Sequence, residues 1–153
     1  MDCCCGTQCE KTPSEILSRI LSATYVLLVK TQNIHWNVKG SMFGYVHSLT
    51  EKHYGELFEA VDEIAERIRQ LGERAPGTMS EFLSMSCVME KLEATSDRDM
   101  ILELKRDHES LCALLKKAIN KISQTDDFVT VDILTSRLSY HEKVVWMLES
   151  NLG

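Results

Sequence analysis

Proline is scarce in this chain, and no long apolar run is present. Two prolines and seven glycines are spread over 153 residues, and most of the sequence is rich in Leu, Glu, Lys, Ala, Met and Ile, which favour helix over strand. No apolar stretch approaches the roughly 20 residues that span a bilayer. The first residues, MDCCCGTQCEKTPSE, have neither the basic start nor the apolar stretch of a signal peptide. The sequence therefore predicts a single-domain, all-α protein of the cytoplasm, with no membrane association.

An excess of basic residues is also missing. The chain has 17 Lys and Arg against 23 Asp and Glu, a formal net charge of −6. General affinity for nucleic acid needs clustered Lys and Arg that neutralise phosphates and release counterions. The balance of charge therefore argues against general DNA binding and favours cations as small partners.

The cysteines do not form a pattern that would staple the fold. Four of them crowd a short polar tail, and two stand alone in the rest of the chain: Cys3, Cys4, Cys5, Cys9, Cys87 and Cys112. This is a poor pattern for a disulfide framework. The four thiols of the tail could bind a soft metal, cross-link neighbouring molecules or scavenge oxidants, and the alternative is a reduced tail without a role.

Hydrophobic periodicity predicts a tail over residues 1–11 and one domain over residues 12–153. The domain begins with a capping box, in which Thr12 caps, Pro13 takes the first helical position and Glu15 follows three residues after the cap. Apolar residues then recur at three- and four-residue steps. The predicted helices cover residues 13–39, 43–71, 96–123 and 128–149, with a short helix at 79–85 in a crossover. Four long helices of this kind predict a bundle.

Two pairs of possible metal ligands lie on the second predicted helix. His47 and Glu51 are four residues apart, as are Asp62 and Glu66, so each pair shares a helix face. Imidazole with carboxylate suits iron, zinc or manganese, and iron where open positions permit oxidation. The two pairs lie about 22 Å apart along a helix and cannot share a metal within one chain. They could meet across a two-fold axis between antiparallel copies of this helix, with a midpoint near Gly55.

Spacing alone favours a simpler interpretation. These four side chains could be solvated and form ordinary surface pairs. His35 could be a hydrogen-bonded core residue and Trp36 a packing residue, and the remaining histidines, His53, His108 and His141, need no metal.

Residues 31–72, TQNIHWNVKGSMFGYVHSLTEKHYGELFEAVDEIAERIRQLG, resemble the signature of the Dps mini-ferritins, the family of DNA-binding proteins from starved cells. The final stretch DDFVTVDILTSRLSYHEKVVWMLESNLG is similar to the last helix of that family, so the resemblance covers residues 13–153. It implies a ferritin-like four-helix bundle with a short extra helix in the crossover, assembled as a spherical dodecamer. Such a shell oxidises Fe²⁺ and stores ferric mineral, which protects the cell from oxidative damage.

The same resemblance implies a ferroxidase centre between two subunits. His35 and His47 would bind iron from one subunit and Asp62 and Glu66 from the other, while Glu51 would hold a second ion directly or through water. The family usually prefers hydrogen peroxide as oxidant and also uses O₂. The cofactor or substrate metal implied is iron, as Fe²⁺ and Fe³⁺.

The family resemblance also implies roles for five further residues. Trp36 and Trp146 would be sinks for stray oxidising equivalents. Asp126, Asp127 and Asp132 would line an acidic three-fold pore through which iron enters, because acidic rings concentrate cations. Aspartates near a helix start are also ordinary caps and partners of the helix dipole, and that alternative stays open.

Two rival functions follow from the same residues. A larger ferritin would use Glu-x-x-His motifs within one bundle, and this sequence contains no Glu-x-x-His. A DNA-compacting protein with secondary iron binding would use a basic arm, but the tail has only Lys11 against Asp2 and Glu10, and the chain ends directly after the last predicted helix. We therefore expect little or no DNA binding near neutral pH.

Overall fold

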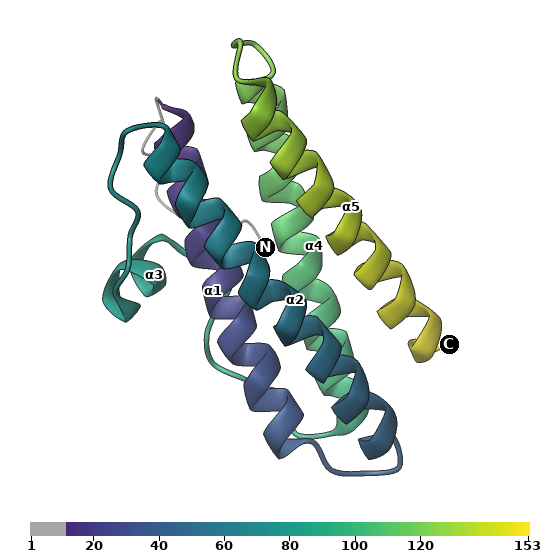
Figure 1. Ribbon diagram of the computed structural model, residues 1–153. Coiled ribbons are helices and arrows are strands. Elements are labelled where there is room, and N and C mark those ends of the chain that lie inside the picture. Colours follow the sequence, from purple (N-terminus) through teal and green to yellow (C-terminus); the bar gives the residue numbers. More distant parts are fainter. Residues whose placement is uncertain (1–11) are drawn as a thin grey trace.

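The computed structural model describes residues 12–153, and the four cysteines of the tail lie outside this range. Within the described range the chain forms five α-helices and no strand (Figure 1): α1 Pro13–Asn37, α2 Phe43–Gln70, α3 Met79–Met85, α4 Asp97–Ile122 and α5 Phe128–Leu152. Helices α1 and α2 pair antiparallel, α4 and α5 do the same, and α3 lies in the crossover between the two pairs. The predicted all-α bundle with a short crossover helix is confirmed.

The helix starts follow from local capping. Thr12 and Glu15 form the expected capping box at α1, and Thr78 and Glu81 form a second one at α3. In each box the hydroxyl accepts the N3 amide and the glutamate accepts the cap amide, which satisfies two backbone donors that a helix start leaves without partners.

The helix ends differ from the prediction by more than one residue at two places. Helix α1 ends at Asn37, two residues before the predicted end, because Val38 is already extended, and Gly40 turns the chain with a left-handed φ of +125°. Helix α5 continues to Leu152, three residues beyond the predicted end. No proline or glycine interrupts its last turn before Gly153, and Asn151 donates to the carbonyl of Met147 within that turn.

The core is built from the predicted apolar stripes. Apolar spacing predicts that Leu17, Leu21 and Leu28 of α1 and Ile101, Leu104 and Leu111 of α4 face inward, and all six are buried. On α5 apolar spacing predicts that Val145 faces inward, but Val144 is the buried residue and Val145 is partly buried. Phe43, at the start of α2, is also predicted to face inward but is exposed. Helix α1 is buried almost all round because it contacts α2, α3 and α4. Its buried hydroxyls, for example those of Thr24 and Thr31, donate to carbonyls one turn earlier, so they carry no unpaired donor.

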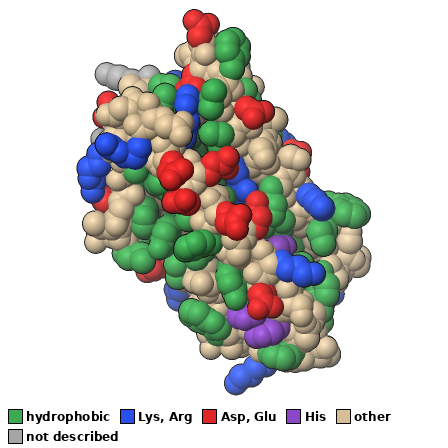
Figure 2. Space-filling view, in the orientation of Figure 1, with side chains coloured by type: hydrophobic (Ala, Val, Ile, Leu, Met, Phe, Trp, Pro, Cys, Tyr) green, Lys and Arg blue, Asp and Glu red, His purple; other side chains and the backbone are tan. Residues whose placement is uncertain are grey.

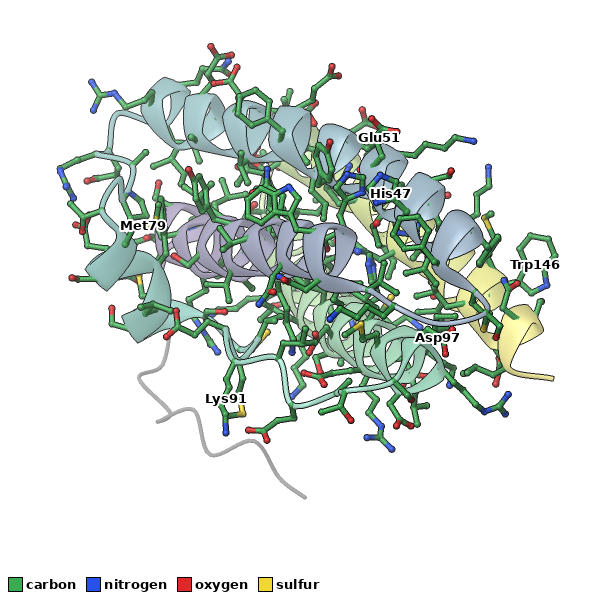
Figure 3. All side chains as sticks on the ribbon, turned by 90° about the horizontal axis from the view of Figure 1, so that it is seen from below. His47, Glu51, Met79, Lys91, Asp97 and Trp146 are labelled. Carbon is green, nitrogen blue, oxygen red and sulfur yellow. The ribbon has the colours of Figure 1, made fainter. Side chains whose placement is uncertain are left out.

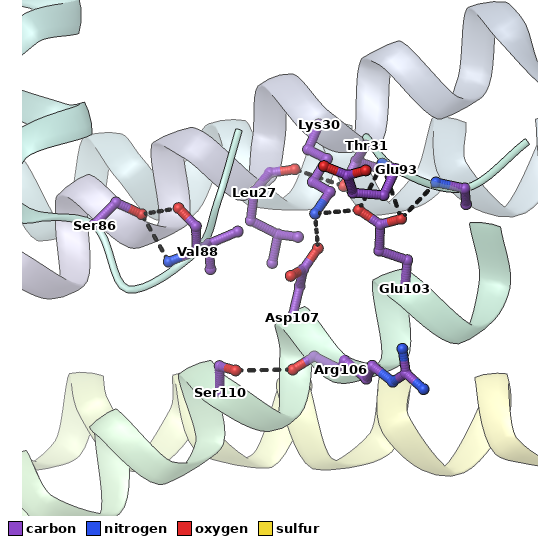
Figure 4. Close-up of polar contacts among 11 residues, drawn as sticks. Leu27, Lys30, Thr31, Ser86, Val88, Glu93, Glu103, Arg106, Asp107 and Ser110 are labelled. Carbon is purple, nitrogen blue, oxygen red and sulfur yellow. Dashed lines mark hydrogen bonds and ion pairs between the residues drawn. The ribbon is translucent and has the colours of Figure 1, made fainter. Parts of the chain in front are cut away.

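A buried ion cluster joins the two helix pairs (Figure 4). The ammonium group of Lys30 on α1 is 2% exposed and lies 2.7 Å from a carboxylate oxygen of Glu103 and 2.8 Å from one of Asp107, both on α4. The contact with Asp107 is an ion pair without hydrogen-bond geometry. Glu103 also accepts the backbone amides of Glu93 and Ala94. The cluster therefore fixes the second half of α1 against α4 and the end of the crossover.

Polar contacts connect α2 with α5 along their length. Glu56 pairs with Arg137 through both guanidinium nitrogens, and Asn151 donates to the hydroxyl of Tyr45. On the face where these helices lie, acidic side chains gather in the middle and histidines lie below them (Figure 2). No helix in residues 12–153 is long and apolar enough to cross a membrane.

Candidate metal centre

His35 and His47 lie against each other where α1 ends and α2 begins. Their imidazole rings stack with centroids 3.7 Å apart and an angle of 17° between planes. The two helices are joined by a short turn through Gly40, and a side-chain oxygen of Asp97 accepts the amide of Met42 at 2.8 Å, which holds that turn on the start of α4. The predicted pairing of these two histidines is therefore present within one chain.

Each imidazole is oriented by the backbone of the other residue. Nδ1 of His35 lies 2.8 Å from the carbonyl oxygen of His47, and Nδ1 of His47 lies 2.9 Å from the carbonyl oxygen of His35. A carbonyl can only accept, so both Nδ1 atoms carry a proton, and in the neutral form of each ring Nε2 keeps its lone pair. Metal-binding histidines are commonly fixed in this way, with one nitrogen donating to a carbonyl and the other free for the metal.

Two residues of α2 complete the surroundings of His35. Thr50 is fully buried, donates to the carbonyl of Val46 at 2.7 Å, and places its oxygen 3.3 Å from Nδ1 of His35. Tyr54 packs its ring edge-on to His35, with centroids 5.2 Å apart. Sequence reasoning missed both residues, although each falls on the same face of α2 as His47 at helical spacing.

The three carboxylates predicted as ligands are exposed. Glu51 lies one turn from His47 on α2, and Figure 3 shows the two side chains together. Asp62 and Glu66 lie further along the same helix. In residues 12–153 of one chain no three His, Cys, Asp or Glu side chains come together as a metal site. Within one chain, the two imidazoles therefore lie at one end of α2, and the carboxylates of Asp62 and Glu66 lie about 22 Å away along its axis.

The two tryptophans are on the surface. Trp36 directly follows His35 but is 68% exposed, and Trp146 on α5 is 65% exposed. Figure 3 shows Trp146 pointing outward near the C-terminal end of α5. Their role as oxidant sinks remains a prediction.

The three aspartates at the start of α5 differ in their partners. Asp126 and Asp132 are exposed. Asp127 is the N-cap of α5: it accepts the amide and hydroxyl of Thr130, and the guanidinium group of Arg67 lies 2.7 Å from it. Although partial burial alone would raise the pKa of Asp127, these hydrogen bonds and the arginine charge hold that pKa below its ordinary value. Asp127 is therefore occupied as a cap, which was the alternative interpretation.

The other three histidines form a cluster inside the bundle. His108 of α4 and His141 of α5 face each other with their Nδ1 atoms 2.8 Å apart, so one nitrogen donates to the other. The ring of His53 on α2 lies 5.9 Å from that of His108, and the ring of Tyr140 packs among the three. The guanidinium group of Arg137 lies 4.7 Å over the centre of the Tyr140 ring.

Burial keeps this cluster uncharged. It lowers the pKa of His108 well below the ordinary range, with smaller effects from His141, His53 and Arg137. Burial, then the charges of Arg137 and His53, lowers the pKa of His141 to about 3. Each histidine falls on an apolar stripe of its helix, so periodicity alone could have placed all three in the core. Nothing in the spacing says that they meet.

Comparisons with known proteins agree with the fold. A family model described as a ferritin-like domain matches residues 14–153. The DNA protection during starvation protein of Helicobacter pylori is 35% identical over 140 residues, which cover 91% of this chain and 97% of that protein. A low temperature-induced protein of Nostoc is 38% identical over 137 residues, covering 88% of this chain and 76% of that protein.

A solved structure shows the same architecture. The Dps protein of Vibrio cholerae, described as a member of a broad superfamily of ferritin-like diiron-carboxylate proteins, matches with a TM-score of 0.88 at 26% identity and covers 92% of this chain and 89% of that one. The bundle with its crossover helix and paired histidines is therefore a ferritin-like protein. Within that class the chain belongs to the Dps family of DNA protection during starvation proteins.

Proposed function

We propose that this protein is a ferroxidase mini-ferritin, which oxidises Fe²⁺ at centres shared by two subunits and stores the ferric product inside a shell of twelve copies. The observation that carries the proposal is the His35–His47 pair. Two stacked imidazoles whose Nδ1 protons are held by carbonyls leave two Nε2 lone pairs for a metal. Imidazole with carboxylate suits iron.

The missing ligands are supplied by symmetry. Asp62 and Glu66 are exposed on the same helix as His47, and they are too far along it to reach the same ion. If α2 packs antiparallel against α2 of a second copy around Gly55, the histidine end of each chain faces the carboxylate end of the other. A Cβ added at Gly55 would meet no atom within 4 Å in the single chain, so a second backbone can approach there. Glu51 would then hold a second ion.

Iron is the substrate at such a centre. One molecule of hydrogen peroxide takes one electron from each of two Fe²⁺ ions, the O–O bond breaks, and two hydroxides form beside two Fe³⁺ ions. No hydroxyl radical is released. The histidines position the metal and the carboxylates balance its charge, while few protein ligands leave coordination positions for the oxidant.

Mixed shells test the intersubunit site directly. One variant carries His35→Ala with His47→Ala, and the other carries Asp62→Ala with Glu66→Ala. The two are co-expressed with different tags, and shells carrying both tags are purified. Wherever the two variants meet at a two-fold interface, one of the two centres has all four ligands. We expect each variant alone to oxidise Fe²⁺ at the background rate and the mixed shells to recover activity.

A centre built within one chain gives the opposite result, because every subunit of the mixed shell lacks part of it. Inactive mixed shells of normal size would therefore contradict the proposal. Wild-type protein that oxidises iron no faster than the His35→Ala, His47→Ala variant would reject the histidine pair itself.

DNA binding is the second function to consider, since relatives are named for DNA protection. The net charge of −6 opposes contact with phosphates. We expect plasmid DNA to migrate unchanged in a gel-shift assay at low salt near neutral pH, and retention of the plasmid would overturn this expectation.

A further inference from the structure

The hydroxyl of Thr50 contacts both ends of the hydrogen bond that orients His35. That bond joins Nδ1 of His35 to the carbonyl oxygen of His47 over 2.8 Å. The Oγ1 atom of Thr50 lies 3.3 Å from the same Nδ1 and 3.1 Å from the same carbonyl oxygen. The three polar groups therefore form a closed triangle at the junction of α1 and α2.

The direction of each hydrogen bond in this triangle follows from the groups present. A carbonyl oxygen can only accept, so the hydroxyl proton of Thr50 is directed toward the carbonyls of Val46 and His47. The lone pairs of Oγ1 then accept from Nδ1 of His35, whose proton is shared between two acceptors. Both acceptors favour the neutral imidazole that carries its proton on Nδ1, and this form keeps its lone pair on Nε2.

Thr50 provides a fixed point for the ring of His35. The side chain of Thr50 is fully buried, and its 2.7 Å contact with the carbonyl of Val46, one turn earlier in α2, restricts its rotation. His35 is 8% exposed, and hydrogen bonds in such surroundings are stronger than in water. His47 is half-buried, and among the described residues its Nδ1 has one acceptor, the carbonyl of His35. The ring of His35 is therefore held by more contacts than the ring of His47.

We propose that Thr50 is a positioning residue that holds His35 ready to bind Fe²⁺ through Nε2. The proposal rests on the ferroxidase function proposed above. A ring whose orientation and proton position are set before the metal arrives loses little freedom on binding, so the affinity for the metal is higher. Thr50 itself does not reach the metal, because its hydroxyl lies on the Nδ1 side of the ring. Its contribution is the affinity of the centre for Fe²⁺.

The test compares assembled shells of wild type with Thr50→Val, Thr50→Ser and Thr24→Val. Valine resembles threonine in shape but lacks the hydroxyl, whereas serine keeps it. Thr24 on α1 is the matched control: it is 1% exposed and donates to the carbonyl of Ile20 at 2.7 Å, as Thr50 does to Val46. Anaerobic titration with Co²⁺, a stand-in for Fe²⁺, measures the affinity and the visible spectrum of the bound ion. The rate of Fe²⁺ oxidation gives KM and kcat.

We expect Thr50→Val to weaken Co²⁺ binding and to raise KM for Fe²⁺ about tenfold, the usual effect of losing a hydrogen-bond partner of a ligand. The value of kcat should stay near wild type, since the lost contact acts on binding of the metal. Thr50→Ser should restore the affinity and the Co²⁺ spectrum, and Thr24→Val should match wild type. If Thr50→Val forms no shells, Thr50→Ala takes its place.

Two results would overturn the assignment of Thr50. One is wild-type Co²⁺ affinity in shells of Thr50→Val, and the other is an equal loss of affinity in Thr24→Val, which would mean that any buried hydroxyl acts through the stability of the bundle. Both leave the ferroxidase proposal standing. If wild type binds Co²⁺ no more tightly than the His35→Ala, His47→Ala variant, the histidine pair is not the metal site, and the proposed function fails together with this inference.

Discussion

His35 and His47 each donate an Nδ1 proton to the main-chain carbonyl of the other residue, over distances of 2.8 and 2.9 Å. This reciprocal arrangement joins the end of α1 to the start of α2. It also decides which nitrogen of each ring is available, because the Nδ1 atoms are already used. In each ring, Nδ1 therefore has a structural role, and Nε2 is the nitrogen left for a metal.

Substitution of His35 by asparagine and by glutamine tests the role of Nδ1 separately from the role of Nε2. An asparagine amide can replace Nδ1 and donate to the carbonyl of His47, whereas a glutamine amide reaches closer to the position of Nε2. We expect His35→Asn to keep the thermal stability of wild type more closely than His35→Ala, while losing metal binding. Calorimetric titration with Zn²⁺, which is not oxidised, measures the binding without redox chemistry. Wild-type Zn²⁺ affinity in His35→Asn would show that Nε2 is not the ligand atom.

Substitutions at Gly55 test the two-fold contact, because they should stabilise an isolated helix but weaken an interface between two helices. The single chain leaves open space beside this glycine, so alanine should stabilise an isolated helix there by up to about 1 kcal/mol. If two α2 helices meet at Gly55, added side chains push them apart instead. We expect Gly55→Ala to weaken assembly and Gly55→Leu to give dimers or monomers in analytical ultracentrifugation. Intact shells in Gly55→Leu would place the two-fold axis elsewhere.

Acid should destabilise the protein through the buried side chains of His108 and His141. His108 and His141 are neutral in the folded state because their pKa values are lowered, that of His141 to about 3 from 6.5. Below pH 6.5 the unfolded chain binds protons at these two histidines, whereas the folded chain does not. The free energy of unfolding is therefore unaffected by them above pH 6.5 and decreases as the pH falls toward 3. Each such group contributes a slope of about 1.4 kcal/mol per pH unit within that window.

The measurement is urea unfolding of wild type and of the double variant His108→Leu, His141→Leu across this pH range. The free energy of unfolding should fall less steeply with acidification in the variant, since it lacks two groups that gain protons on unfolding. His141→Gln, which keeps a polar partner for His108, provides a second variant if the double substitution folds poorly. Parallel curves for wild type and both variants would contradict the assignment.

Lys30 is expected to be among the residues on which stability depends most. Removal of its charge leaves Glu103 and Asp107 close together and largely buried, and burial already raises the pKa of Asp107 despite the ion pair with Lys30. Breaking a buried pair from one side costs about 3–5 kcal/mol. We expect Lys30→Met to lower the urea midpoint strongly. Lys91→Met is the matched control, because the Lys91–Glu93 pair is exposed on both sides, and exposed pairs contribute little.

The parts of the fold that sequence could predict are those with a local cause. The helices follow from apolar spacing and from the caps at Thr12 and Gly40, and the pairing of His35 with His47 follows from a family resemblance. The hydrogen bonds that orient the two rings could not be predicted from the sequence. They depend on a turn held by Asp97, which lies 55 residues beyond Met42.

The histidine cluster could not be predicted for a related reason. Apolar spacing places His53, His108 and His141 on the inner faces of three helices. Whether the rings meet depends on how α2, α4 and α5 are rotated and shifted against one another, and periodicity carries no information on relative height along the bundle. The sequence therefore indicated only that these three histidines need no metal, and it did not predict that they form a cluster.

We expect the acidic residues at the start of α5 to divide into a structural residue, Asp127, and an iron-guiding set, Asp126 and Asp132. Asp127 caps the helix and binds Arg67 and Thr130, whereas Asp126 and Asp132 are exposed. Loss of an N-cap costs about 1 kcal/mol, so Asp127→Ala should lower the melting temperature. Asp126→Asn with Asp132→Asn should leave that temperature near wild type and slow the entry of iron, because the entrance loses negative charge that attracts cations.

Stopped-flow measurement of Fe²⁺ oxidation at low and high ionic strength tests the iron-guiding set. In wild type, added salt should slow oxidation at limiting Fe²⁺, since it screens the attraction between the entrance and the cation. The double asparagine variant should be slower at low salt and respond less to salt. At saturating Fe²⁺ the two proteins should converge, because the centre itself is unchanged. Equal rates and equal salt dependence at limiting Fe²⁺ would show that iron enters by another route, and Asp126 and Asp132 would then be ordinary surface residues beside a capped helix.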